Sequence, residues 1–94
     1  MGTEILDEVF AVIEDRRDNP KEGSYVSGLL AKGKAEVIWK FEEEAGEFSA
    51  AAKGDEKAKI IHEAADVMFH VMMLLAAKGV RLDEVMEELR RRRR

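Results

Sequence analysis

The sequence predicts an all-α protein, a helical bundle of about five helices with a four-helix core that is completed by dimerisation. Apolar residues recur at three- and four-residue spacing in five segments, and no segment shows the convincing alternation of a strand. The single proline and the 6% aromatic content also favour helices. With 94 residues the chain has room for one domain, 1–94. A chain this short buries only about 60–65% of its unfolded surface, so we expect copies to associate.

Local signals delimit the first two expected helices. The first is expected over about 3–17, where Thr3 can cap its start and apolar residues line one face. Pro20 ends it, because the residue before a proline disfavours helical backbone. A short helix follows over 24–32, and Gly33 stops it.

The other three helices are expected over about 34–53, 56–78 and from 82 to about 89. Gly54 and Gly79 end the first two of these, and Asp55 caps the helix that begins at 56. From Val67 to Ala77 that helix is apolar almost all round, which is typical of a helix buried on most sides. One small chain cannot easily surround such a helix, so we expect a second subunit to cover it.

The composition excludes several classes of protein. Without cysteine there is no disulfide, thiolate nucleophile or zinc–sulfur site, which suits a cytoplasmic protein. The N-terminal residues lack the long apolar core of a signal peptide. The apolar region 64–77 contains Asp66 and His70 and is too short to span a membrane. We therefore expect no membrane partner.

Charge is distributed unevenly along the chain. The net charge of −4 includes +5 from the five arginines at 90–94, which leaves −9 on the remaining residues. An acidic body repels nucleic acid, so none is expected as a partner. The basic tail 90–94 is expected to complement the dipole of the last helix and to fray. Nucleic-acid binding by this tail is a weaker alternative, because no second basic patch accompanies it.

Two groups of carboxylates carry the chemical information. The first is Glu43-Glu44-x-x-Glu47, and the second is Glu63-x-x-Asp66. Residues three apart project from one helix face, and an antiparallel hairpin turning at 54–55 would bring the two groups together. Crowded carboxylates repel one another unless they are protonated or neutralised.

A divalent cation with oxygen ligands would resolve this repulsion. Mg²⁺, or alternatively Mn²⁺, suits an all-oxygen site, and phosphates usually complete its shell. A di-iron site is disfavoured, because such sites use Glu-x-x-His pairs and this chain has none. The alternative is a solvated acidic stripe, which is most plausible for Glu43 and Glu44 taken alone.

The segments 40–47 and 63–70 resemble the signature of the all-α nucleoside triphosphate pyrophosphohydrolases, the MazG-like group. More of the chain resembles one family in this group, phosphoribosyl-ATP pyrophosphohydrolase: 6–14, 19–20, 23–25, 29–33 and 79–85. The resemblance implies hydrolysis of phosphoribosyl-ATP to phosphoribosyl-AMP and pyrophosphate, the second step of histidine biosynthesis. Two departures are Glu42, where a glycine is expected, and Glu36, where lysine is frequent. Neither changes the acids.

The resemblance also implies roles for the acids. The expected metal ligands are Glu44, Glu47, Glu63 and Asp66. Glu43, Glu44 and Glu47 are the expected catalytic residues, with Glu43 either accepting a proton from the attacking water or supporting the ligands.

Five further residues are candidates for binding the substrate: Arg16, Ser24, Tyr25, Lys40 and His70. All of them except Tyr25 have a structural alternative. Lys40 could instead pair with Glu44, and Arg16, like Arg17, could stabilise a helix C-terminus. Ser24 could be a helix cap, and His70 could be a core histidine bonded to Asp66.

Two other functions remain open from the sequence. One is a house-cleaning nucleoside triphosphate pyrophosphohydrolase of the MazG-like group, which would accept an unmodified nucleotide. The other is a non-catalytic helical dimer, in which the acids are merely surface residues and divalent metal has no effect.

Overall fold

The computed structural model describes residues 2–93, which form five α-helices and no strand. The helices are α1 (Glu4–Asp18), α2 (Tyr25–Ala31), α3 (Lys34–Ala52), α4 (Lys57–Ala77) and α5 (Leu82–Arg92). The all-α class and the number of helices are therefore as predicted.

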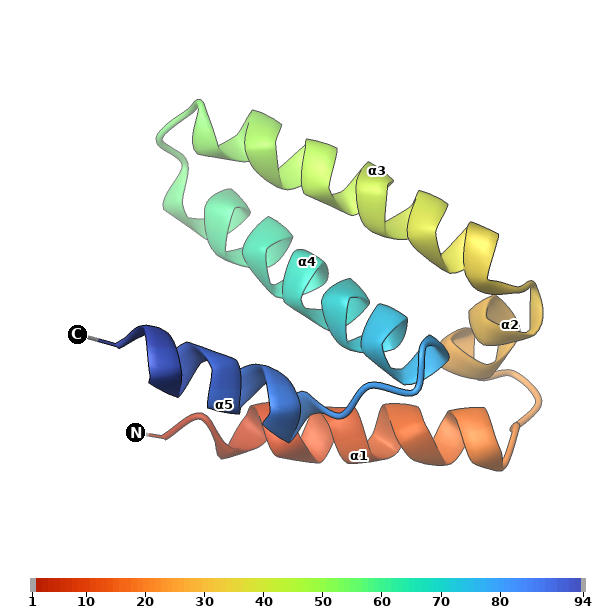
Figure 1. The fold of residues 1–94 in the computed structure, drawn as a ribbon. Helices are drawn as coiled ribbons and strands as arrows, with labels where there is room; N and C mark the ends of the chain where they lie inside the picture. Colours follow the sequence, from red (N-terminus) through yellow and green to blue (C-terminus); the bar gives the residue numbers. More distant parts are fainter. Residues whose placement is uncertain (1, 94) are drawn as a thin grey trace.

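Helices α3 and α4 form an antiparallel hairpin, and α1 packs against α4 on the other side (Figure 1). The short helix α2 contacts α1, α3 and α4, at the end of the hairpin where α3 begins and α4 finishes. The two ends of the chain lie on the same side of the molecule (Figure 1). The loops are short because glycines turn the chain; Gly33, for example, has φ 103° between α2 and α3.

The core lies where α1, α2 and the second half of α4 meet. Its buried residues are Phe10, Ile13, Val26, Leu29, Val37, Met72, Met73, Ala76 and Leu82. Because Val37 is near the start of α3, this core closes one end of the hairpin. The predicted acids lie nearer the other end of the hairpin. The core therefore determines the register between α3 and α4 without enclosing these acids.

The helix ends test the predicted caps. Ser24 caps α2 as anticipated, its hydroxyl accepting a hydrogen bond from Ser27 N at 3.1 Å. Thr3 occupies the N-cap position of α1, but its side chain makes no capping hydrogen bond. Asp55 was predicted to cap α4, and this is wrong: Glu56 stands at that position, also without a side-chain cap.

The basic tail differs from its prediction. Helix α5 does not fray at residue 90 but continues through Arg92. Ion pairs one turn apart explain this, since Arg90 and Arg91 reach Glu87 and Glu88 respectively, and Arg92 Nε donates to Glu88 at 3.0 Å. The last residue of the predicted tail, Arg94, lies outside the described residues.

Helix α4 is less covered than its composition suggests. Within residues 2–93, it is the one helix long and apolar enough to cross a membrane, judged by length and composition alone. Core helices of soluble proteins pass the same test, and Glu63, Asp66 and His70 interrupt the apolar surface of this one. Its apolar residues Ile61 and Met68 are exposed in the single chain.

Candidate active site

The α3–α4 hairpin brings three of the predicted acids together. One carboxylate oxygen from each of Glu44, Glu47 and Glu63 lies within 4.8 Å of the others. Glu44 and Glu63 are both 8% exposed, whereas Glu47 is exposed at the edge of the group. We call these three residues the acid cluster.

Glu44 carries a buried carboxylate oxygen whose hydrogen-bonding capacity is not satisfied within the part of the chain that the structure describes. Its Oε2 is buried and has no hydrogen-bond partner among the described residues, and its Oε1 lies 3.6 Å from Lys40 Nζ. A buried carboxylate oxygen without a partner is costly and uncommon in folded proteins. A bound cation would give it one, so the residues present fit a divalent metal.

Glu63 is the second acid with a perturbed environment. Burial raises the pKa of its carboxyl, and the negative charges of Glu47, Asp66 and Glu44 raise it further, against a smaller lowering by His62. The raised pKa indicates a carboxylate that is destabilised when ionised. A cation in the acid cluster would remove this penalty.

The fourth predicted ligand, Asp66, lies in a neighbouring group with His62 and Glu63. Its Oδ2 is 3.3 Å from His62 Nε2, and Glu63 Oε1 is 3.8 Å from the same nitrogen. Glu63 thus belongs to both groups. The sequence analysis did not single out His62, whose side chain is 73% exposed, but its spacing of four from Asp66 could have indicated the contact.

Among the described residues, Glu43 belongs to neither of the two groups that could hold a metal. It accepts a hydrogen bond from Lys40 Nζ at 2.7 Å, and this bond raises the pKa of the Lys40 ammonium. The ion pair of Lys40 with Glu44 that the sequence offered as an alternative is present, but the pair with Glu43 is shorter. Lys40 therefore connects the predicted base to the acid cluster.

Tyr25 and His70 meet beside these acids. The Tyr25 hydroxyl and His70 Nε2 are 2.9 Å apart, and His70 Nδ1 lies 2.7 Å from the backbone oxygen of Asp66. His70 is 5% exposed and packs edge-on against Phe69 and Tyr25. The predicted bond of His70 to Asp66 is thus made to its backbone, not to its carboxylate.

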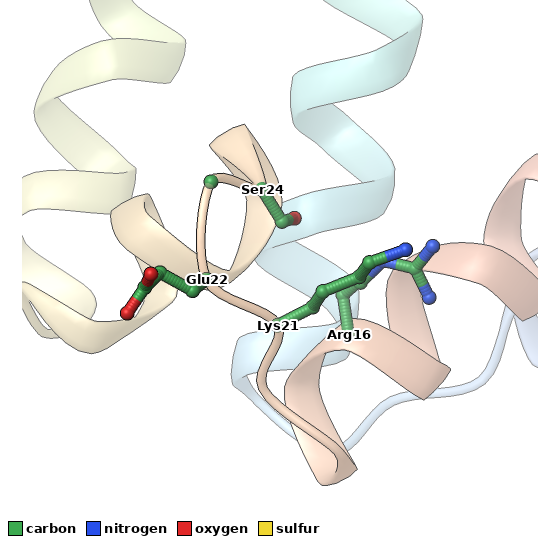
Figure 2. A pocket seen from close by; sticks show the side chains of 5 residues that line it. Arg16, Lys21, Glu22 and Ser24 are labelled. Carbon is green, nitrogen blue, oxygen red and sulfur yellow. The ribbon is translucent and has the colours of Figure 1, made fainter.

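A second polar site lies between α1 and α2. It is a hollow of about 330 Å³ lined by Arg16, Lys21, Glu22, Gly23 and Ser24, which we call the basic hollow. Figure 2 shows the Arg16 and Lys21 side chains extending in the same direction, with the Ser24 hydroxyl toward them and the Glu22 carboxylate pointing away. Arg16 also pairs with Asp15 at 2.7 Å. Two cations and a hydroxyl on one side of a hollow suit an anion.

Sequence reasoning found Arg16 and Ser24 but missed two other residues of this region. Lys21 stands in a loop, where no periodicity gives its direction. Ser27 is buried, donates from its hydroxyl to the Arg16 carbonyl at 2.9 Å and accepts from Lys21 N at 3.0 Å. Arg17 does not join the hollow, because its guanidinium donates to the Ala76 carbonyl at the end of α4.

Comparison with known proteins decides the family. The sequence model described as phosphoribosyl-ATP pyrophosphohydrolase matches residues 6–93. The chain belongs to the phosphoribosyl-ATP pyrophosphohydrolase family. The resemblance drawn from the acid signature and from the further segments between residues 6 and 85 is thereby confirmed, and the chain is a member of a family of hydrolases.

Relatives at full length are similar throughout the chain. A phosphoribosyl-ATP pyrophosphatase from Methanocella arvoryzae is 47% identical over 93 residues, which cover 97% of this chain and 98% of that protein. The protein of the same name from Methanococcoides burtonii is 45% identical over 91 residues, covering 95% and 92%. A histidine biosynthesis bifunctional protein from Parasynechococcus marenigrum is 48% identical over 86 residues, 92% of this chain but 39% of that protein.

Proposed function

We propose that this chain hydrolyses phosphoribosyl-ATP to phosphoribosyl-AMP and pyrophosphate, with Mg²⁺ as cofactor and Mn²⁺ as the alternative metal. Relatives that match nearly the whole chain carry the name of this activity. The observation that carries the proposal is the acid cluster, with its buried Glu44 oxygen left without a partner among residues 2–93. Such a site suits a hard cation, and phosphates complete the shell of Mg²⁺.

Glu44, Glu47 and Glu63 would hold the metal, and Asp66, through its proximity to Glu63, would complete the set. Bound Mg²⁺ supplies positive charge that offsets the charge developing on the departing pyrophosphate. All four ligands offer oxygen, which favours magnesium or manganese over iron.

Lys40 and Glu43 would act together on the reacting groups. If Lys40 turns its ammonium away from Glu43 to donate to a phosphate oxygen, the Glu43 carboxylate would give up its 2.7 Å partner and be free to take a proton from water. The water oxygen bonds to the α-phosphorus, and the bond from that phosphorus to the bridging oxygen breaks. Its electron pair leaves with pyrophosphate, and the proton remains on Glu43.

The basic hollow would select the substrate. Phosphoribosyl-ATP differs from ATP by a second ribose that carries its own phosphate, and Arg16, Lys21 and Ser24 present three donors to an anion. Ser24 still has its hydroxyl proton to give, because its oxygen acts as acceptor in the helix cap. Tyr25 follows Ser24 and lies beside the acids, so α2 connects the two sites.

The molecule would work as a homodimer or a higher homo-oligomer. An apolar surface covers adjoining faces of α1 and α4, and we call it the α1–α4 surface: Ile5, Val9, Val12, Met68 and Phe69. Its hollows measure about 410 and 360 Å³, and Asp66 lines the larger one. Burying such a surface is favourable at about 25 cal/mol per Å². A second copy seated here would also border the metal site. We place the protein in the cytoplasm, with a small-molecule substrate and neither nucleic acid nor membrane as partner.

The test is pyrophosphate release from phosphoribosyl-ATP, with Mg²⁺ or with EDTA, alongside ATP and dUTP. We expect release from phosphoribosyl-ATP only when metal is present. Glu44→Gln should reduce kcat by at least 100-fold, whereas Glu42→Gln, an exposed acid on the same helix, should not. Release from ordinary triphosphates would favour the house-cleaning alternative. No release from any of them would leave the non-catalytic dimer.

A further inference from the structure

The hydrogen-bond directions around His70 determine what the Tyr25 hydroxyl can offer to a ligand. The backbone oxygen of Asp66 can only accept, so His70 Nδ1, 2.7 Å away, carries the proton and donates it. In the neutral imidazole, Nε2 is then an acceptor. The Tyr25 hydroxyl, 2.9 Å from Nε2, must therefore donate its single proton to His70.

Two features keep this arrangement in place. His70 is 5% exposed and its ring is held edge-on by Phe69, so it cannot turn away without disturbing the core side of α4. Burial of the phenol raises the pKa of Tyr25, which keeps its proton available to donate. With that proton committed to His70, the phenol oxygen presents only lone pairs to the solvent side, where Tyr25 is 52% exposed.

The surroundings of the phenol oxygen narrow the choice of ligand group. The Tyr25 hydroxyl meets α4 at His70, one helical turn after Asp66, so it lies beside one of the expected metal ligands. Phosphate oxygens are acceptors and cannot bond to an oxygen that offers lone pairs alone. The group next to the triphosphate in phosphoribosyl-ATP is a ribose, whose hydroxyls are donors.

We infer that Tyr25 accepts a hydrogen bond from a hydroxyl of the ribose that bears the triphosphate, and that His70 is the positioning residue that fixes this polarity. The inference rests on the proposed function for the nature of the ligand. It divides the role expected from the sequence, because Tyr25 contacts the substrate at a sugar hydroxyl and His70 acts through Tyr25.

The experiment combines substrate and protein variants. Phosphoribosyl-ATP is compared with its 2′-deoxy and 3′-deoxy forms, modified on the triphosphate-bearing ribose, using wild-type protein and Tyr25→Phe. We expect Tyr25→Phe to lower kcat/KM for the ribose substrate about 3- to 10-fold, as for one neutral hydrogen bond. One deoxy substrate should lose a similar factor with wild type and lose nothing more with Tyr25→Phe. Trp39→Phe, at an exposed aromatic residue outside the site, should leave every ratio unchanged.

Two substitutions of His70 separate positioning from packing. In His70→Gln the longer amide oxygen reaches toward Tyr25 and can still accept its proton. In His70→Asn the shorter amide can still donate to the Asp66 carbonyl but does not reach Tyr25. We expect His70→Gln to retain the wild-type ratio of ribose to deoxy activity, and His70→Asn to lose it. If these variants fail to fold, the Tyr25→Phe comparison, made at a half-exposed side chain, decides alone.

Two results would overturn the inference. One is a Tyr25→Phe loss that is equal for the ribose and both deoxy substrates, which would place Tyr25 away from the sugar. The other is no effect of Tyr25→Phe on any substrate. If wild-type protein hydrolyses ATP and not phosphoribosyl-ATP, the proposed function fails, and the same comparison with ATP and its deoxy forms still tests Tyr25. If it hydrolyses neither, both are rejected.

Discussion

Replacing Glu44 with glutamine should have opposite effects on stability with and without metal. Glu44 and Glu47 have oxygens within 4.8 Å, a separation at which two charges repel by about 1 kcal/mol in water-like surroundings and about 3 kcal/mol at an effective dielectric constant near 20. Because Glu47 is exposed, the lower figure applies. The glutamine amide can also donate to a neighbouring carboxylate. Lys40 Nζ, 3.6 Å from Glu44 Oε1, attracts Glu44 by a similar amount, and repulsion from Glu63 offsets that attraction. In EDTA, Glu44→Gln should therefore stabilise the fold by about 1 kcal/mol, or about 4–8 °C in Tm.

With bound metal, the wild-type protein should instead be more stable than Glu44→Gln. Mg²⁺ at ten times its Kd stabilises the wild-type protein by about 1.4 kcal/mol, which corresponds to about 6–11 °C for a domain of this size. Glu44→Gln removes a ligand and should show little of this rise. Thermal unfolding followed by circular dichroism, with EDTA and with a series of Mg²⁺ concentrations, measures both effects. Glu42→Gln is the matched control and should behave as wild type.

The reasoning would be refuted by either of two results. If Glu44→Gln melts below wild type in EDTA, the buried carboxylate makes a favourable contact that outweighs its repulsion. If Glu44→Gln keeps the full Mg²⁺-induced rise in Tm, the metal binds elsewhere. Both results are independent of any activity measurement, so they test the acid cluster itself.

Three further predictions concern Glu63, the α1–α4 surface and the basic hollow. The pKa of Glu63 is raised in the folded state, so its contribution to stability is full below the ordinary glutamate pKa and is lost as pH rises through the raised value. Urea unfolding in EDTA should show this decline of stability with pH. Glu63→Gln or added Mg²⁺ should flatten the pH dependence. Met68→Asp should convert the proposed dimer to monomer in light scattering, whereas Trp39→Asp, outside that surface, should not. Ser27→Ala removes the hydroxyl bonds to Arg16 and Lys21 and should cost about 1–3 kcal/mol of stability. It should also raise KM for phosphoribosyl-ATP more than it lowers kcat. An unchanged KM would show that the basic hollow does not bind the substrate.

The fold was predictable because its signals are local. Apolar spacing, a proline and the glycines at 33, 54 and 79 delimit five helices in the sequence, and the structure has five. The errors are also local. Asp55 and Glu56 are adjacent acids, and either could precede α4. The tail was expected to fray, but Glu87 and Glu88 lie one turn away and pair with its arginines.

The site was predictable as a set of faces but not as a set of contacts. Spacing places Glu44 and Glu47 on one face of α3, and the hairpin brings that face to Glu63. Spacing does not determine which rotamer Lys40 adopts, and so its shorter bond to Glu43 could not be foreseen. The position of Asp66 along the axis of α3 depends on the register between α3 and α4. The core around Val37 and Met73 determines that register.

The basic hollow was harder still, because its position depends on a loop. Lys21 has no helical neighbours to give its direction, and Ser27 holds it through a backbone nitrogen, a contact with no sequence pattern. This hydrogen bond nevertheless joins two parts of the proposed site. Ser27 fixes the loop to the end of α1, and two residues earlier in the chain Tyr25 is bonded to α4 through His70. The short helix α2 thus holds the basic hollow and the acid cluster at a fixed separation. A substrate with phosphates at both ends requires such a separation, and an ordinary triphosphate does not.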